Sequence, residues 1–252
     1  MKRRLGQHFL FEKNVLKKII DCSGIGPDDT VVEIGAGYGT LTILLTERTK
    51  KVIALEIDRK LISKLNSSLE KIRNVEIIEA NALKFPYENL GERFKVVANI
   101  PYYITTPLIF RLLECRGKIS TMTLLLQKEI AQRIIASPGG KDYGVLSITV
   151  QLYTKPESKF TVSRRAFSPP PDVDSEVVHF EVFHRPRFEI KDVDFFLKVV
   201  KTAFSHRRKT LLNSLRSFQG IKEAFTVAGI DSQLRPETLS INDFIKLSDA
   251  LR

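Results

Sequence analysis

The stretch EIGAGYGTL, residues 33–41, decides the fold of this chain. It extends an apolar run at 30–35 that is typical of a buried strand, and it leads into a segment at 40–48 with helical spacing of apolar residues. Three glycines lie between the two elements: Gly35, Gly37 and Gly39. Glycines here allow the backbone to pass close to a ligand at the N-terminus of the helix. The stretch therefore predicts a strand, a ligand-binding turn and a helix.

The alternation of strand and helix continues to about residue 136. Apolar runs predict further strands at 51–58, 74–80, 94–100 and 121–126. Helical spacing of apolar residues predicts helices at 14–23, 59–72, 107–114 and 127–136. Because strands that alternate with helices form parallel βαβ units, the pattern predicts a doubly wound α/β sheet.

Two more strand-like runs follow without a full helix between them, at 146–154 and 175–183. The proline-rich stretch FSPPPDVD, residues 167–174, separates them. We expect a hairpin-like pair that closes one edge of the sheet, with seven strands in all and the last one antiparallel.

After about residue 186 the strand signal stops. Four segments with helical spacing follow, at 192–204, 207–215, 221–229 and 241–251. We therefore expect an α/β domain over 1–185 and a small all-helical domain over 186–252.

The composition is that of an ordinary soluble globular protein, with 43% hydrophobic and 27% charged residues among 252. No stretch approaches the roughly 18 apolar residues of a membrane span. The basic N-terminal stretch has too short an apolar run for a signal peptide, so we expect a cytoplasmic protein. Cys22 and Cys115 lack a CxxC partner and the four histidines lack metal-ligand spacing, so we expect neither a disulfide nor a metal site.

The charge balance is strongly basic. Lys and Arg number 40 against 29 Asp and Glu, which gives a net charge of +11. Such an excess favours a polyanionic partner, most often a nucleic acid, although a generally basic proteome would produce the same balance.

Two acidic residues specify the ligand expected at the glycine turn. Glu56 ends the second predicted strand, where a carboxylate can accept hydrogen bonds from both hydroxyls of a ribose. Glu33 directly precedes the turn and favours a cationic ligand over a pyrophosphate. The combination E-x-G-x-G-x-G resembles motif I of class I methyltransferases that use S-adenosylmethionine (SAM). A glycine turn beside a solvated glutamate is the alternative.

The stretch NIPYYIT, residues 99–105, follows the fourth predicted strand. It resembles the catalytic turn of methyltransferases that act on planar exocyclic amines, and ligands of doubly wound sheets bind at this end of the strands. The Asn99 side-chain oxygen and the Ile100 carbonyl would accept the two N–H bonds of an adenine amino group. Pro101 would fix the turn, and Tyr102 would stack on the flipped base. A capped turn with core tyrosines is the alternative.

The chain as a whole resembles the ribosomal RNA adenine N6,N6-dimethyltransferases of the KsgA type. Six motifs occur in the family's order: QHFL (7–10), EIGAGYGTLT (33–42), NIPYYITTPL (99–108), LLLQKEIAQR (124–133), FSPPPDVDS (167–175) and SHRRKTLLNSL (205–215). The resemblance implies a Rossmann-like methyltransferase sheet, SAM as cofactor, and two adjacent adenosines near the 3′ end of small-subunit ribosomal RNA as substrate.

The resemblance also implies roles for individual residues. Beside the target base, Phe167 would form a second aromatic wall opposite Tyr102. The implied cofactor-binding residues are Gln7, His8 and Leu10 in an N-terminal lid, Gly35 and Gly37 beside the methionine part of SAM, Glu56 at the ribose, Asn81 at the adenine amino group, and Asn99 between cofactor and base.

Three positions depart from the family pattern. Asn81 stands where the family usually has Asp, which still provides an acceptor but could weaken SAM binding. His8 replaces a common Asn, and either side chain can form hydrogen bonds. Tyr103 stands where Asn is frequent, and the sequence alone assigns it no role.

A basic stretch is expected to open a C-terminal helix that contacts RNA, through Arg207, Arg208 and Lys209. A solvated helix face is the alternative for such a run of charges. We expect a monomer that acts on immature small ribosomal subunits. An Erm-type enzyme that methylates large-subunit RNA, a non-catalytic assembly factor and a nicotinamide-dependent dehydrogenase remain alternatives; the last lacks the GxGxxG spacing.

Overall fold

The structure is a computed structural model that describes residues 8–206 and 208–252. The described residues form two compact units: one contains those up to Ala131 together with Thr154–His184, and the other contains those of Gln132–Tyr153 and Arg185–Arg252. The division differs from the expected boundary after residue 185 because residues 132–153 group with the helical unit. Within the described ranges, no helix has the length and apolarity needed to cross a membrane.

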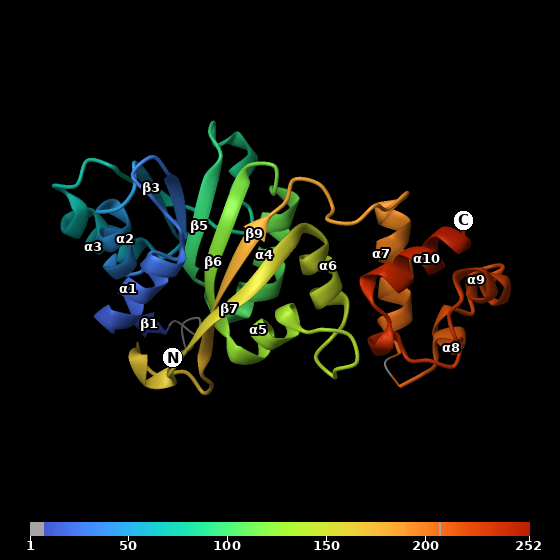
Figure 1. Cartoon of the computed structure of the whole chain (residues 1–252). Helices are drawn as coiled ribbons and strands as arrows, with labels where there is room; N and C mark the ends of the chain where they lie inside the picture. The colour runs from blue at the N-terminus through green and yellow to red at the C-terminus, as the bar shows by residue number, and fades with distance from the viewer. Residues whose placement is uncertain (1–7, 207) are drawn as a thin grey trace. The chain divides into compact units, whose positions relative to one another are not determined.

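The first unit is built on a seven-stranded sheet with the order β4-β3-β2-β5-β6-β9-β7 (Figure 1). Its strands are β2 (Thr30–Ile34), β3 (Lys51–Glu56), β4 (Val75–Glu79), β5 (Phe94–Asn99), β6 (Ile119–Gln127), β7 (Thr154–Val162) and β9 (Ser175–Val182). Pairs from β4 to β6 are parallel, whereas β9 is antiparallel to both of its neighbours. The predicted doubly wound sheet with an antiparallel last strand is confirmed.

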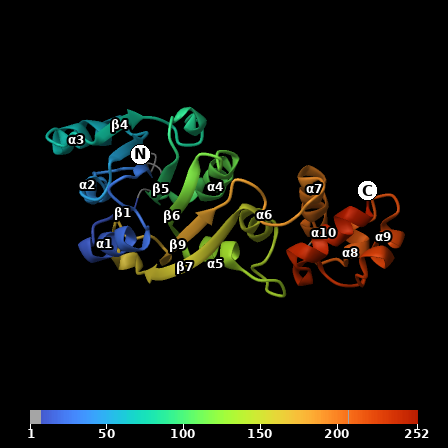
Figure 2. The same cartoon turned by 45° about the horizontal axis from the view of Figure 1, so that its top comes forward.

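Helices cover both faces of this sheet. Figure 2 shows α1, α2 and α3 on one face and α4 on the other. The helices that begin in this unit are α1 (Lys13–Cys22), α2 (Thr40–Thr46), α3 (Arg59–Leu69), α4 (Thr105–Glu114) and α5 (Lys128–Ile135), with short 3-10 turns η1 (Tyr87–Asn89), η2 (Tyr102–Ile104) and η3 (Arg164–Ala166). Since both faces are covered, the central strands are apolar along their length, as Val31, Val32 and Val96 illustrate.

A second, two-stranded sheet attaches the N-terminal segment to the first unit. Strand β1 (Phe9–Leu10) pairs antiparallel with β8 (Phe167–Ser168), so that Leu10 lies opposite Phe167. Both side chains are buried in the cluster that α1 forms with the sheet. This pairing brings the beginning of the described chain beside the proline-rich stretch.

The segment 146–154, which the sequence predicts as a strand, is a helix, α6 (Val145–Tyr153). The prediction is wrong because the segment is buried on nearly every side, and a short apolar run has no periodicity that separates a strand from a buried helix. Two polar side chains that lie one helical turn apart are the feature of the sequence that indicates a helix here. The Ser147 hydroxyl donates to the Arg133 carbonyl, and the Gln151 amide donates to the carbonyls at the end of α5. The expected edge pair forms instead from β7 and β9.

The second unit is helical, as predicted. Besides α6 it contains α7 (Val193–Phe204), α8 (Leu211–Leu215), α9 (Ile221–Ala228), α10 (Ile241–Ala250) and the 3-10 turn η4 (Pro236–Thr238). The Phe204 ring lies 5.9 Å from that of Phe244 and 6.2 Å from that of Tyr143, measured between centroids. Ser240 and Asp243 form a capping box at the start of α10, which explains why that helix begins there.

The helix expected over 207–215 is shorter than predicted. Helix α8 begins only at Leu211, because Thr210 has extended backbone geometry and the Leu211 N–H donates to the carbonyl of Leu234. Arg208 and Lys209 therefore precede the helix rather than open it, and both are exposed. Arg207 lies outside the described residues.

Candidate active site

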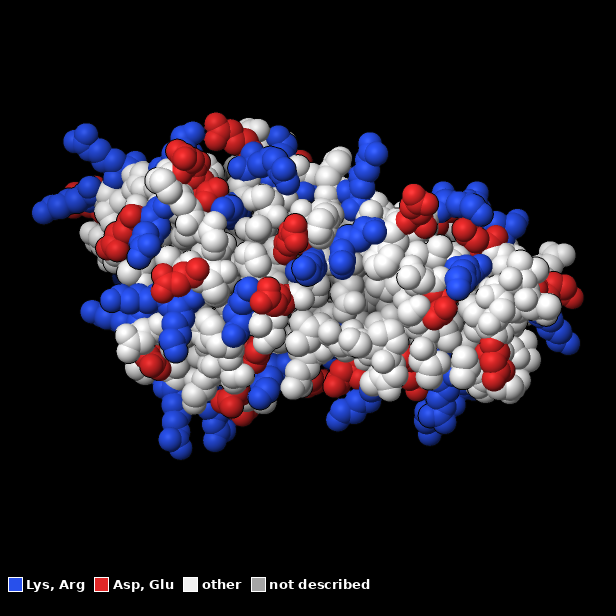
Figure 3. Space-filling model, in the orientation of Figure 1, with Lys and Arg blue, Asp and Glu red and all other residues white. Residues whose placement is uncertain are grey.

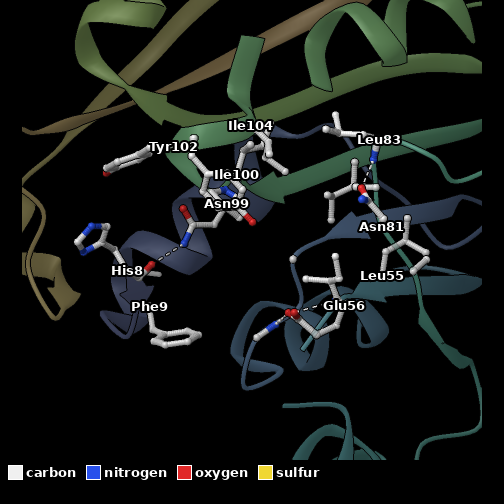
Figure 4. Close-up of a pocket in the computed structure, with 18 residues that line it drawn as sticks. His8, Phe9, Leu55, Glu56, Asn81, Leu83, Asn99, Ile100, Tyr102 and Ile104 are labelled. Carbon is white, nitrogen blue, oxygen red and sulfur yellow. Dashed lines mark hydrogen bonds between the residues drawn. The ribbon is translucent and has the colours of Figure 1, made fainter. Parts of the chain in front are cut away.

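A cavity of about 330 Å³ lies at the carboxyl ends of the parallel strands (Figure 4). Its wall is formed by the segments that leave β2, β3, β4 and β5, and by two residues of the N-terminal segment. The lining residues are His8, Phe9, Ile34, Gly35, Gly37, Leu55, Glu56, Ile57, Ala80, Asn81, Ala82, Leu83, Asn99, Ile100, Pro101, Tyr102, Tyr103 and Ile104. Side chains from five separate segments meet here because parallel strands end at the same edge of a sheet.

The glycine turn forms one wall and requires glycine for two reasons. Gly37 has a φ of +60°, and a Cβ built on it would lie 3.2 Å from two carbons of the Phe9 ring. Gly39 has a φ of +81°, and its Cβ would lie 2.9 Å from Leu65 Cδ2. A side chain would thus strain the backbone and push against the helix or the ring that covers the turn.

Glu56 links the glycine turn to the end of β3. Its Oε2 accepts a hydrogen bond from the Gly37 N–H at 2.9 Å, and its Oε1 accepts from the N–H groups of Ile57 at 2.8 Å and Asp58 at 2.9 Å. The residue is only 4% exposed, yet it lines the cavity. Three backbone donors therefore fix the carboxylate in place before any ligand binds, while lone pairs remain for ligand hydroxyls.

Asn81 lies on the same side of the cavity, after β4. Its Oδ1 accepts a hydrogen bond from the Leu83 N–H at 2.9 Å, which closes a tight local turn. Leu55, Ile57 and Leu83 provide apolar surface around it. This half of the cavity combines a fixed carboxylate, a fixed amide and an apolar wall, and it suits a nucleoside.

Asn99 ends β5 on the other side of the cavity. Its Nδ2 donates a hydrogen bond to the His8 carbonyl at 3.2 Å. This contact orients the amide so that its oxygen points toward the side where Tyr102 lies (Figure 4). An acceptor in this position can receive an N–H of a planar amine bound beside Tyr102.

The turn after β5 holds Tyr102 firmly. The Ile100 N–H donates to the Leu125 carbonyl at 3.3 Å, and the Ile104 N–H donates to the Pro101 carbonyl at 3.1 Å. The Tyr102 hydroxyl is 2.7 Å from the hydroxyl of Ser175 on β9. Burial raises the pKa of the Tyr102 phenol above its ordinary value.

Glu33 is buried beside the glycine turn but does not line the cavity. It is 2% exposed, and its Oε2 has no hydrogen-bond partner among the described residues. Burial raises the pKa of this carboxyl to about 8, with a smaller contribution from the charge of Glu56. The group is therefore protonated at neutral pH, which does not favour the expected proximity to a cationic ligand.

The structure does not bring every predicted residue to the cavity. Leu10 and Phe167 are buried in the cluster beneath it, at 5% and 2% exposure, and neither lines it. The role of Phe167 as an aromatic wall stays a prediction. Gln7 lies outside the described residues. Arg208 and Lys209 belong to the second unit and not to the unit that contains the cavity.

Other lining residues were not predicted. They are mostly apolar neighbours of motif positions: Phe9, Leu55, Ile57, Leu83, Tyr103 and Ile104. Sequence offers a signal for Tyr103, because an aromatic residue in a turn that follows a buried strand is rarely left in water without a partner. Its ring is 51% exposed at the cavity.

Figure 3 shows Lys and Arg distributed across one face of the molecule, with Asp and Glu among them. Many of the ion pairs involve exposed partners, such as Lys50 with Glu92 and Arg59 with Glu79, and add little to stability. The basic excess therefore supplies a general attraction to polyanions.

Comparison with known proteins places these observations in a family. A family model described as ribosomal RNA adenine dimethylase matches residues 1–252. The chain is 43% identical to a ribosomal RNA small subunit methyltransferase A of Caldanaerobacter subterraneus subsp. tengcongensis, covering 99% of this chain and 97% of the relative. It is 44% identical to the protein of the same name from Moorella thermoacetica, covering 100% of this chain and 92% of the relative.

Two solved structures are similar over nearly the whole chain. A dimethyladenosine transferase from Plasmodium falciparum has a TM-score of 0.80 at 31% identity, with 95% of this chain and 96% of that chain covered. The 23S rRNA methyltransferase ErmE has a TM-score of 0.77 at 27% identity, with 96% and 99% covered.

Proposed function

Because the chain belongs to the ribosomal RNA adenine dimethylase family, we propose that it transfers methyl groups from SAM to N6 of two adjacent adenosines near the 3′ end of small-subunit ribosomal RNA. One observation carries the proposal. A single cavity has a nucleoside-type half around Glu56 and the glycine turn, and facing it a half in which an amide oxygen and an aromatic ring converge, from Asn99 and Tyr102.

The residues of the first half fit SAM. The fixed Glu56 carboxylate would accept hydrogen bonds from the ribose hydroxyls, and the apolar side chains beside Asn81 would contact the adenine ring. The glycines of the turn have no side chains, so only backbone atoms of the turn would contact the rest of the cofactor. When bound, SAM supplies a methyl group on a positively charged sulfur, which is already activated for transfer.

The residues of the second half fit an adenine amino group. The nitrogen lone pair of this group is delocalised into the ring, so the nitrogen is a poor nucleophile. The Asn99 side-chain oxygen and the Ile100 carbonyl would accept its two N–H bonds and favour a more tetrahedral nitrogen as the transition state forms. Tyr102, held by Ser175, would stack on the flipped base.

The exposed cations of the second unit would contact RNA phosphates. Arg208 and Lys209 are exposed in the segment before α8, and Arg207 is the adjacent basic residue in the sequence. Such contacts position RNA without reading its sequence. We propose that the substrate is an immature small subunit and that the enzyme acts as a monomer.

The likeness to ErmE favours a second candidate, methylation of large-subunit RNA, because that structure is named as a 23S rRNA methyltransferase. The identity of 43–44% over the whole chain to small-subunit enzymes favours the first. Purified protein with labelled SAM and undermethylated small subunits, and separately with large subunits, distinguishes the two. Label in small-subunit RNA alone supports the proposal, and label in large-subunit RNA alone supports the second candidate.

A further inference from the structure

The rim of the cavity carries two large apolar side chains that are exposed to solvent, Ile57 and Tyr103. Ile57 is 49% exposed and follows β3 directly, whereas Tyr103 is 51% exposed and lies in the 3-10 turn η2. The other large apolar side chains of comparable exposure among the described residues do not line this cavity. Exposed apolar surface that gathers at the mouth of a pocket indicates contact with a ligand.

The geometry of η2 directs its two tyrosines to different sides. A 3-10 helix has three residues per turn, so consecutive side chains diverge by about 120°. The Ile104 N–H donates to the Pro101 carbonyl at 3.1 Å, which fixes the backbone of both tyrosines. The Tyr102 hydroxyl is 2.7 Å from that of Ser175 on β9, so Tyr103 extends away from β9 and from the target half.

Tyr103 faces the cofactor half of the cavity. The turn that carries it lies against the glycine turn, because a Cβ built on Gly35 would lie 3.6 Å from Pro101 Cδ. Burial raises the pKa of the Tyr103 phenol, and the charge of Glu56 raises it further, which places the phenol within the electrostatic range of that carboxylate. Since both residues line the same cavity, a ligand bound at Glu56 occupies the space beside the Tyr103 ring.

From this arrangement we infer that the Tyr103 ring is an outer cover of the bound cofactor, closing the side of the cavity beside Ile57 and Glu56. The inference rests on the proposed function, in which SAM binds against Glu56. It gives a cofactor-binding role to a residue of the NIPYYIT stretch that the family resemblance leaves without one. The family frequently has Asn at this position, and an Asn side chain has no ring to lay over a cofactor. Tyr103 therefore adds apolar contact to SAM in this chain.

Three substitutions separate the Tyr103 ring from its hydroxyl. Tyr103→Phe keeps the ring alone, Tyr103→Asn keeps a polar group without a ring, and Tyr103→Ala removes both. Phe11→Ala is the matched control, because Phe11 is also an exposed aromatic residue, at 55% exposure, and does not line the cavity. The Tm of each variant checks that it is folded, and exposed positions such as these should tolerate substitution.

The first experiment measures the Kd of SAM by calorimetry, and KM and kcat for undermethylated small subunits at saturating SAM. We expect Tyr103→Ala and Tyr103→Asn to raise the Kd of SAM about 5- to 30-fold, through loss of the contact with roughly half a ring. Tyr103→Phe and Phe11→Ala should match the unsubstituted protein. KM for the subunits and kcat should not change in any variant, because Tyr103 does not contact the target base.

A second experiment detects the cover without any turnover. N-acetylimidazole transfers its acetyl group to accessible tyrosine hydroxyls and releases imidazole, and mass spectrometry of peptides locates the modified residues. Tyr103 and Tyr38 are 51% and 44% exposed, so both should react in the protein without ligand. Saturating SAM should slow acetylation at Tyr103 several-fold. It should leave Tyr38 unchanged, because that side chain does not line the cavity.

Three results would overturn the inference. One is an unchanged Kd of SAM in Tyr103→Ala, and another is equal acetylation of Tyr103 with and without bound SAM. The third is a rise in KM for the subunits with an unchanged Kd of SAM, which would assign the Tyr103 ring to RNA instead. Absence of SAM binding by the unsubstituted protein would refute the proposed function itself, and the cover with it.

Discussion

The two halves of the cavity are held in place by different kinds of contact. In the cofactor half, the Glu56 carboxylate accepts three backbone hydrogen bonds and binds the glycine turn to the end of β3. In the target half, Asn99 and Tyr102 are each held by one side-chain hydrogen bond, to the His8 carbonyl and to Ser175. Backbone groups of the loops after β2 and β3 fix the first half, whereas the second depends partly on the N-terminal segment.

The difference matches what each half is proposed to bind. A small cofactor gains affinity from groups that are fixed before it arrives, because less conformational entropy is lost on binding. A base that must leave an RNA helix needs a slot that can open. Substitutions in the two halves should therefore affect different measured quantities.

Asn99→Ala tests the target half and should have the largest effect. Loss of the oxygen that stabilises the amino group in the transition state should lower kcat about 10²- to 10³-fold. The Kd of SAM should change much less than kcat, because the amide bonds to the His8 carbonyl and not to a residue of the cofactor half. Asn66→Ala, at an exposed position of α3, is the control. A large rise in the Kd of SAM would show that the two halves are not separate.

Glu56→Gln tests the cofactor half. The amide nitrogen of Gln would face backbone N–H groups, and each buried donor left unpaired costs about 1–3 kcal/mol. We expect a lower free energy of unfolding in urea and a SAM affinity reduced about tenfold or more. The exposed Glu70→Gln should change neither quantity. Full SAM affinity in Glu56→Gln would contradict the assignment of the ribose site.

Gly37→Ala and Gly24→Ala form a matched pair. Both glycines have positive φ, +60° and +64°, so each alanine should cost about 1–2 kcal/mol in the free energy of unfolding. Only at Gly37 would the new Cβ meet another group, the Phe9 ring at 3.2 Å; at Gly24 nothing lies within 4 Å among the described residues. Weaker SAM binding is thus expected for Gly37→Ala alone. Equal SAM affinities of the two variants would show that the Phe9 ring over the turn does not contribute to SAM binding.

Glu33→Gln tests the buried carboxyl beside the glycine turn through the pH dependence of stability. The pKa of Glu33 is about 8 in the folded chain, above the 4.5 of an exposed glutamate. A raised carboxyl pKa means that the unfolded chain releases its proton first, so this group lowers stability as pH rises from about 4.5 to about 8. The Glu33→Gln variant has no carboxyl to titrate at this position. Its Tm should therefore fall less than that of the unsubstituted protein between about pH 4.5 and about pH 8. Parallel Tm profiles would contradict the raised pKa.

The sequence brought several candidate cofactor residues to the cavity because they lie at or near strand ends. Gly35, Gly37 and Glu56 each come directly after or at the end of an apolar run, and parallel strands bring such ends together. The same reasoning placed Asn99 and Tyr102 at the cavity. The parallel strands β2 to β6 followed from the alternation of strands and helices, whereas the edge strand β7 did not.

The sequence failed where long-range packing decides the outcome. The run at 146–154 became helix α6 because its surroundings bury nearly all its faces, which local pattern does not reveal. The place of Phe167 in the fold was also not foreseen: pairing of β1 with β8 buries it opposite Leu10, and its role beside the base stays a prediction. The same pairing brings His8 to Tyr102, a contact between segments far apart in the sequence.

The most direct test of the account is the nucleoside content of small-subunit RNA in a strain that lacks its own dimethylase and carries this chain. Mass spectrometry of the mapped fragment should show N6,N6-dimethyladenosine at two adjacent positions with the unsubstituted protein, and none with Asn99→Ala. Unmodified adenosines at both positions, with a folded protein that binds SAM, would contradict the claim that the two halves form one adenine methylation site.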